Sequence, residues 1–320
     1  MLSRVADSVY WMSRYIERAE NLARFLDVTF QLMLDLPSDA PQQWQPLVST
    51  SGDHELFAER YGPATRDSVV QFLTFDPDYP NSILRCVQAA RENARSIRET
   101  ISSEMWENLN DFYQLVMDAA LNRNMATEPQ QFYHEVRQAG HLFEGITDGT
   151  MSHNEGWHFA RLGRLIERAD KTSRILDVKY FLLLPKIEDV GTPIDDLQWS
   201  AVLRSVSGLE MFRKRHHGIT PERVVGFLVL DRLFPRAIMY CINAADESLH
   251  AISGSPPGTF WNSAEKRMGQ LRSELAYAHV RDIMGRGLHE FLDSLQIRLN
   301  DIGEAIADTF IAIEPEQQHA

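Results

Sequence analysis

Two similar segments of the sequence carry glutamate followed by arginine at matching positions, and these segments are the clearest candidates for chemistry. One is Glu17-Arg18 and the other is Glu167-Arg168. A carboxylate can transfer protons as a general acid or base, and arginine binds carboxylates and phosphates through paired, planar donors. One hypothesis is therefore an enzyme in which Glu17 or Glu167 is the acid or base and the flanking arginines hold an anionic substrate.

The same residue types also allow two arrangements without catalysis. In one, the arginines of both segments face a shared cleft and bind an anionic ligand or a partner. In the other, Glu17 and Arg18 pair with Arg168 and Glu167, and such buried pairs specify register more than they stabilise a fold. The candidate anion-binding residues in these segments are Arg14, Arg18, Arg164 and Arg168.

A third cluster of charge lies between the two segments and includes Arg91 and Arg95. The corresponding stretch of the second half, 246–252, keeps the apolar positions but has no arginine. One interpretation is a charged helix surface with pairs at i,i+4 spacing. The other is an anion- or partner-binding surface built mainly by the first half, to which Arg91 and Arg95 belong.

The chain carries an internal duplication that positions these segments. Residues 14–28 match residues 164–178 at nine of fifteen positions, with an offset of 150. Farther along, an offset of 155 holds over many residues, among them Pro80 and Pro235, Ile83 and Ile238, and Trp106 and Trp261. Repeats of this length indicate two copies of one structural plan. We expect a first repeat over 1–150 and a second over 151–320, joined in one fused domain over 1–320.

Apolar residues recur with helical spacing in both halves, and no alternating strand pattern is convincing. The predicted fold is all-α, a helical bundle built from an internal duplication with pseudo-two-fold symmetry. Helix starts are predicted at Ser152, Thr65 and Thr220, where a capping residue precedes an acid within the first turn. Because both halves carry it, the Trp106 and Trp261 pair is expected in the core. The predicted helical runs after residue 75 are 80–102, 104–123, 127–149, 234–254, 258–283 and 288–312.

Several other chemistries have little support in the sequence. The two cysteines, Cys86 and Cys241, are at matching positions on apolar faces, so we expect core residues rather than nucleophiles. His153 and His158 lie near Glu155, but no paired histidine or cysteine spacing of a zinc site occurs, and we expect neither a metal site nor a cofactor. Glycine-rich phosphate loops are also missing.

Composition restricts the class of partner. The 320 residues carry a net charge of −13, which argues against a nucleic-acid binder because such a protein needs a basic surface. Only five residues are lysine and none lies in the first 150, so the arginine bias indicates organised ion pairs or anion contacts. No signal-peptide core and no apolar stretch of about 18 residues is visible. We therefore expect a cytoplasmic protein that does not bind membranes.

Three separated motifs resemble one family. Residues 10–21, residues 90–95 and the stretch from Gly156 to Asp170 are similar to the bacterial alpha-E family, which is all-helical and named for its Glu-Arg motif. The resemblance covers essentially the whole chain. It implies that the gene lies near genes for an ATP-grasp amidoligase and a transglutaminase-like peptidase, and some such gene clusters also encode a proteasome-like subunit. It also implies a role in a system that makes or attaches peptide-like products. It carries over the motif but no catalytic residue.

Together these features favour a non-enzymatic accessory or scaffold subunit. Its expected partner is the ATP-grasp ligase, with the transglutaminase-like peptidase as a further one. In this hypothesis an arginine-lined surface or cleft faces the ligase or its acidic peptide or nucleotide ligand. The alternative is an enzyme of the same pathway that uses Glu17 or Glu167.

Overall fold

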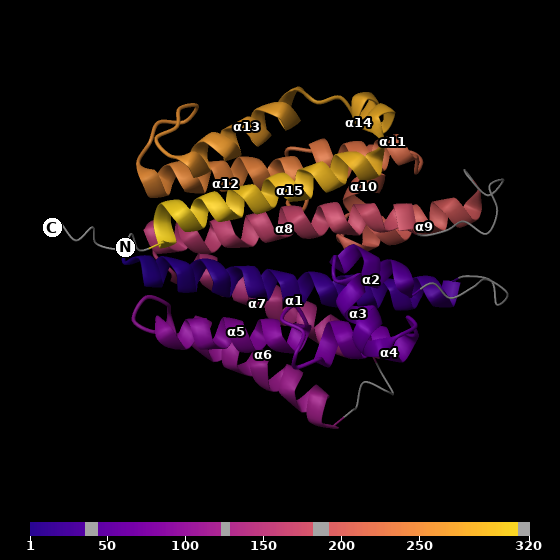
Figure 1. The fold of residues 1–320 in the computed structure, drawn as a ribbon, viewed down its shortest axis with the longest axis horizontal. Helices are drawn as coiled ribbons and strands as arrows, with labels where there is room; N and C mark the ends of the chain where they lie inside the picture. Colours follow the sequence, from indigo (N-terminus) through magenta and orange to yellow (C-terminus); the bar gives the residue numbers. More distant parts are fainter. Residues whose placement is uncertain (36–43, 123–128, 182–191, 313–320) are drawn as a thin grey trace.

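The computed structural model describes residues 1–35, 44–122, 129–181 and 192–312. Within these ranges every regular element is helical and none is a strand, which confirms the predicted all-α class. Two long helices, α1 (Ser3–Asp35) and α8 (Glu155–Phe181), lie side by side through the middle of the molecule (Figure 1). Each carries one Glu-Arg segment, so the fold brings together the two segments that lie 150 residues apart in the chain.

The other helices cover this central pair. Those that follow α1 are α2 (Gln45–Ser51), α3 (His54–Tyr61), α4 (Arg66–Val70), α5 (Ile83–Ser96), α6 (Ser103–Asn122) and α7 (Pro129–Thr150). Those that follow α8 are α9 (Pro193–Ser205), α10 (Leu209–Arg215), α11 (Pro221–Val225), α12 (Ile238–Ser253), α13 (Ser263–Tyr277), α14 (Val280–Arg286) and α15 (Leu288–Ile306). Helices α5 and α7 pack on α1, and α12 and α15 pack on α8.

Local structure repeats at the offset found in the sequence. Helix α4 continues into a π-helical turn, η1 (Gln71–Phe75), and α5 follows. A shift of 155 residues gives α11, the π-helical turn η4 (Gly226–Leu230) and α12. A third π-helical turn, η5 (Ala307–Ile311), ends α15. The pseudo-two-fold relation between the halves, and their division at residue 150, stay predictions.

Capping residues explain where several helices begin. Thr65 and Thr220 accept hydrogen bonds from the backbone of Ser68 and Arg223, so both predicted starts are confirmed. The start at Ser152 is wrong by two residues: α8 begins at Glu155, and the Asn154 side chain accepts from the Gly156 backbone. Asparagine therefore provides the cap that the sequence assigned to serine.

Two further expectations need correction. The single helix predicted over 258–283 is two helices, because the Asn262 side chain caps α13 and the chain turns extended at Ala278 and His279. Trp261 is 66% exposed rather than buried in the core. Its partner Trp106 is half-buried, with Arg98 stacked over its ring.

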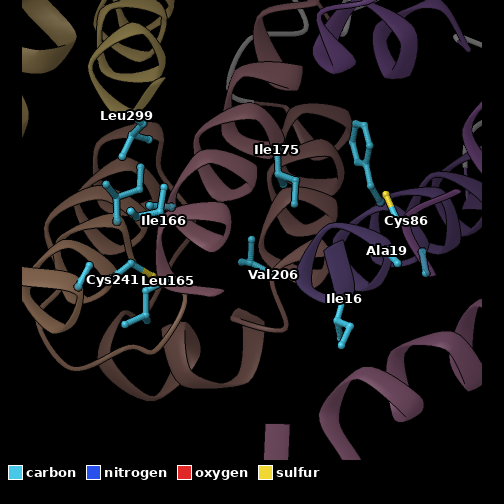
Figure 2. Close-up of a cluster of buried hydrophobic side chains, with 14 of the residues drawn as sticks. Ile16, Ala19, Cys86, Leu165, Ile166, Ile175, Val206, Cys241 and Leu299 are labelled. Carbon is cyan, nitrogen blue, oxygen red and sulfur yellow. The ribbon is translucent and has the colours of Figure 1, made fainter. Parts of the chain in front are cut away.

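The buried apolar residues of both halves form one continuous cluster around α1 and α8. Figure 2 shows part of it, with Ile16 and Ala19 on α1 and Ile166 on α8. The two central helices touch closely at Gly163, where a Cβ would lie 2.4 Å from the backbone oxygen of Tyr10. Only glycine fits this contact, and the close approach brings the charged side chains of both helices within hydrogen-bonding range.

Candidate functional site

The two Glu-Arg segments pair across the interface of α1 and α8. Arg18 donates through Nε and Nη2 to the two carboxylate oxygens of Glu167, at 2.7 and 3.0 Å. Arg168 donates through Nε and Nη2 to the two oxygens of Glu17, both at 2.8 Å. Each pair is bidentate, the geometry in which arginine binds a carboxylate most strongly. The structure therefore contains the cross-helix arrangement considered from sequence.

Additional charged groups surround each pair and form two clusters. The Glu167 cluster has two carboxylates and four cations. Arg14 Nε donates to Glu167 at 2.9 Å, and Lys171 Nζ lies 3.5 Å from the same carboxylate. The second carboxylate is Asp170, which contacts Lys171 and Arg174 at 3.0 Å. The members of the Glu167 cluster are Glu167, Asp170, Arg14, Arg18, Lys171 and Arg174.

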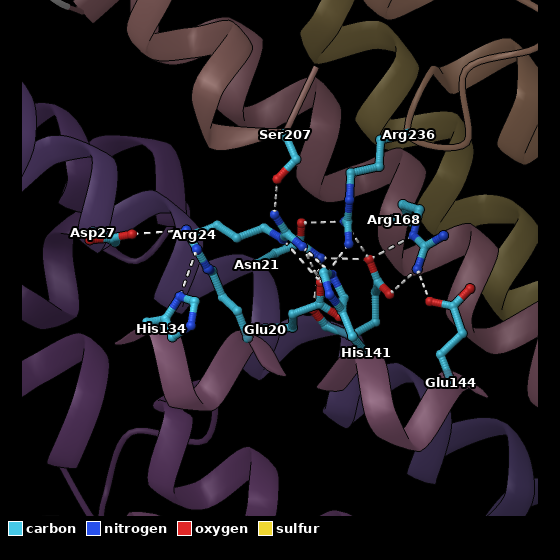
Figure 3. A network of polar contacts seen from close by, with 12 residues as sticks. Glu20, Asn21, Arg24, Asp27, His134, His141, Glu144, Arg168, Ser207 and Arg236 are labelled. Atoms are coloured by element: carbon cyan, nitrogen blue, oxygen red, sulfur yellow. Dashed lines mark hydrogen bonds and ion pairs between the residues drawn. The ribbon is translucent and has the colours of Figure 1, made fainter. Parts of the chain in front are cut away.

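The Glu17 cluster has three carboxylates and four cations (Figure 3). Arg236, from the turn before α12, donates to Glu17 at 3.0 Å and to Glu20 at 2.5 Å. Arg24 donates to Glu20 at 2.7 Å, and Glu144 of α7 accepts from Arg168 at 2.8 Å. The remaining member, Arg164, contacts Glu144 at 3.2 Å. The members of the Glu17 cluster are Glu17, Glu20, Glu144, Arg24, Arg164, Arg168 and Arg236.

The cationic neighbours keep the buried carboxyl groups ionised. Burial raises the pKa of Glu167, but Arg18, Lys171 and Arg14 outweigh it and hold that pKa well below its ordinary value. In the same way, Lys171 and Arg174 outweigh burial and lower the pKa of Asp170 to about 2. Both carboxylates are therefore charged throughout the physiological range.

The cations show the opposite effect where they crowd together. Burial and the neighbouring charge of Arg236 lower the pKa of the Arg24 guanidinium to about 10, although Glu20 raises it. A guanidinium ordinarily keeps its proton at any accessible pH. Burial is the larger cause of this shift and the charge of Arg236 the smaller one, whereas carboxylates raise the pKa values of Arg14, Arg18, Arg168 and Arg174.

This geometry does not favour proton transfer by the two motif glutamates. The side chains of Glu17 and Glu167 are 2% and 0% exposed, and both are occupied by arginine. A general acid or base needs access to substrate and a pKa near the working pH. The ion pairs instead hold α1 against α8, so the motif positions the fold.

The candidate binding residues separate into two groups. Arg14, Arg18, Arg164 and Arg168 lie in the two clusters, with 5–15% of each side chain exposed. Arg91 of α5 donates instead to Asn110 of α6 at 2.7 Å. Arg95 is 67% exposed and pairs with Glu92. Within the described residues, the ion pairs of Arg91 and Arg95 do not connect to either cluster.

Several charged residues of the clusters were not singled out from sequence. The repeat contained a signal for some of them, because Glu20 and Arg24 match Asp170 and Arg174 at i,i+4 spacing. Arg236 gave no such signal, since Asn81 stands at its matching position. Glu144 lies in the part of the sequence where the two halves no longer align.

The other candidate groups are placed as follows. Cys86 and Cys241 are buried free thiols, and burial raises the pKa of each to about 12, which disfavours the reactive thiolate. His153 stacks on Trp157 with ring centroids 4.0 Å apart. Within the described residues, no group of three or more histidine, cysteine or acidic side chains could hold a metal ion. None of the described helices is both long and apolar enough to span a membrane.

Comparisons with known proteins agree with the fold and the motif. A family model called Alpha-E, described as a predicted alpha-helical domain with a conserved ER motif, matches residues 1–311. This chain therefore belongs to the Alpha-E family. It is similar to uncharacterized proteins of Mycobacterium bovis and Mycobacterium tuberculosis, with 23% identity over 338 residues. The match covers 97% of this chain and 37% of each relative, so this chain spans well under half of their length. No solved structure matches it.

Proposed function

We propose that this Alpha-E protein is a non-catalytic partner subunit of an ATP-grasp amidoligase system. Its cationic centre would bind the ligase or the acidic peptide or nucleotide ligand of that ligase. The observation that carries this proposal is the charge imbalance of the two clusters. They contain eight cations and five carboxylates in a chain whose net charge is −13.

An excess of partly buried positive charge is unfavourable without an anion close by. The lowered pKa of Arg24 is consistent with such an excess. A protein that needed these arginines only to join two helices could balance them with acids. The imbalance therefore supports recognition of an anion as a second role of the centre.

Two observations support a partner rather than an independent enzyme. The motif glutamates are buried and held by arginines, which leaves them poorly placed for proton transfer. In the mycobacterial relatives the matching region is part of a much longer chain, which is consistent with a domain that acts together with other domains or proteins. The ATP-grasp class of partner, and the transglutaminase-like peptidase as a second one, rest on the family resemblance.

The test is co-purification with the ATP-grasp ligase from the same genome. We expect the two proteins to co-elute in size-exclusion chromatography and the ligase turnover of ATP to change when this protein is added. Arg267→Gln is the control, because Arg267 is exposed and lies outside both clusters. Failure to co-elute together with an unchanged ligase turnover would overturn the proposal.

A further inference from the structure

A pocket beside the Glu167 cluster has the composition of an anion site. It lies between α1, α2 and α8 and is open to solvent. Arg18, Lys171 and Arg174 line it, and none of the described residues that line it is a carboxylate. These three side chains are 14–21% exposed.

Cations outnumber carboxylates next to this pocket. The Glu167 cluster has four cations for two carboxylates, whereas the Glu17 cluster has four for three. One further acid, Asp53, accepts hydrogen bonds from the lining residues Tyr79 and Asn81, at 2.5 and 3.5 Å. Even with Asp53 included, cations remain in excess next to the pocket.

The duplicated sequence differs at one residue that lines this pocket. Asn81 and Arg236 occupy matching positions, each two residues before a long helix, α5 or α12. Arg236 extends into the Glu17 cluster and donates to two of its carboxylates. The shorter Asn81 accepts a hydrogen bond from Arg18, at 2.5 Å, and fills less space. The Glu167 cluster therefore keeps an opening where the Glu17 cluster holds an arginine.

The other residues that line the pocket are of two kinds. Asn21, Thr50, Ser51, Tyr79 and Asn81 are polar, and Leu22, Phe25, Leu47 and Ile175 give it an apolar part. A bare inorganic anion would contact the cations but gain nothing from the apolar part. A ligand with a carboxylate at one end and an aliphatic group at the other satisfies both, since apolar burial adds to the charged hydrogen bonds.

We infer that this pocket binds a small organic carboxylate with an aliphatic portion, such as the terminal carboxyl group of a peptide. This inference deepens the proposed function and rests on it for the expectation that the carboxylate belongs to a peptide-like molecule. Arg174 and Lys171 provide charged donors for the carboxylate, and Arg18, whose guanidinium already donates to Glu167 and Asn81, adds its positive charge. Leu22 and Phe25 contact the aliphatic group.

The test is isothermal titration calorimetry of the whole protein with four probes. N-acetyl-leucine represents the C-terminal residue of a peptide, and 4-methylpentanoate is a carboxylate of similar shape without the amide. N-acetyl-leucinamide removes the charge, and inorganic phosphate removes the aliphatic part. We expect N-acetyl-leucine to bind at least tenfold more tightly than either the amide or phosphate. If 4-methylpentanoate binds as tightly as N-acetyl-leucine, a carboxylate with an aliphatic group is sufficient. If it binds more weakly, the pocket prefers the carboxylate of a peptide. Either result supports a carboxylate pocket.

Two variants locate the binding. Arg174→Gln removes a lining cation, and Leu22→Trp fills the pocket without breaking an ion pair, so it remains informative if the first variant folds poorly. We expect at least tenfold weaker binding in each, with Arg267→Gln, a change at an exposed arginine outside both clusters, unchanged. Binding of the amide or of phosphate as tight as that of N-acetyl-leucine, or full binding by Leu22→Trp, would overturn the inference. If no probe binds while the ligase still co-elutes, the pocket assignment fails and the proposed function stands. If the probes bind but this protein neither co-elutes with the ligase nor changes its turnover, the pocket assignment stands and the proposed function fails.

Discussion

Replacing Glu167 with glutamine tests the role of the Glu-Arg motif in holding the two central helices together. The substitution keeps the shape of the side chain but removes its charge. In the structure the Glu167 carboxylate accepts three hydrogen bonds from Arg14 and Arg18 and lies 3.5 Å from Lys171. Glutamine would leave these three cations without their shared counter-charge, and its amide would direct donors at other donors.

The expected loss follows from the complete burial of this side chain. Removing one partner of a buried ion pair costs about 3–5 kcal/mol of unfolding free energy, because the other charge stays buried and uncompensated. A chain of 320 residues has an unfolding entropy of about 0.7 kcal/mol per kelvin. The loss therefore corresponds to a decrease in Tm of about 4–8 °C.

Thermal unfolding at pH 7, followed by circular dichroism, measures this decrease. Arg95→Gln is the matched control, because it also removes one charge but from an exposed pair. A surface change of that kind is expected to alter stability by less than about 0.5 kcal/mol, or about 1 °C in Tm. A Glu167→Gln protein that melts within about 1 °C of the parent would refute a structural role for this carboxylate.

Three further outcomes are expected. Gly163→Ala should destabilise the protein by about 1–3 kcal/mol through overpacking. Gly145→Ala, whose added Cβ meets no atom within 4 Å, should stabilise it by about 0.5–1 kcal/mol. Tm values that move in the same direction in both variants would contradict the close contact of α1 and α8. The pKa values of Glu167 and Asp170 are lowered on folding, so their stabilisation is complete above about pH 5 and is lost as the pH falls through their folded values. Tm should therefore fall between about pH 5 and 2, and less steeply in Asp170→Asn; parallel profiles would contradict this. Arg18→Met combined with Glu167→Gln should cost about 1–3 kcal/mol less than the sum of the two single changes in urea unfolding, and additive losses would show that the pair is not coupled.

The sequence predicted the helical class and the cross-helix pairing because both depend on periodic, local information. The duplication placed Glu17-Arg18 and Glu167-Arg168 on equivalent helices, and the fold packs these helices together. Arg236 could not be predicted, since its contacts with α1 bridge more than 200 residues and its matching residue is asparagine. The pocket depends on that same difference between the halves.

Other differences have simpler causes. Trp261 matches Trp106 in sequence but is largely exposed, because it precedes α13 directly and its backbone N–H is held by Glu265. The separation of α13 from α14 occurs at Ala278 and His279, which are not helix-breaking residues. The break at Gly287 was predictable, because glycine readily adopts the positive φ with which many helices end, and here its φ is 99°.

The central claim is that the Glu-Arg motif is a permanently charged clamp between two helices rather than an acid or base. The most direct measurement is the titration of the Glu167 carboxyl group by carbon-13 NMR of protein with labelled glutamate side chains, assigned with Glu167→Gln. The account predicts an ionised carboxylate whose resonance does not shift between pH 8 and about pH 4.5. A titration of Glu167 with its midpoint near neutral pH would contradict the account.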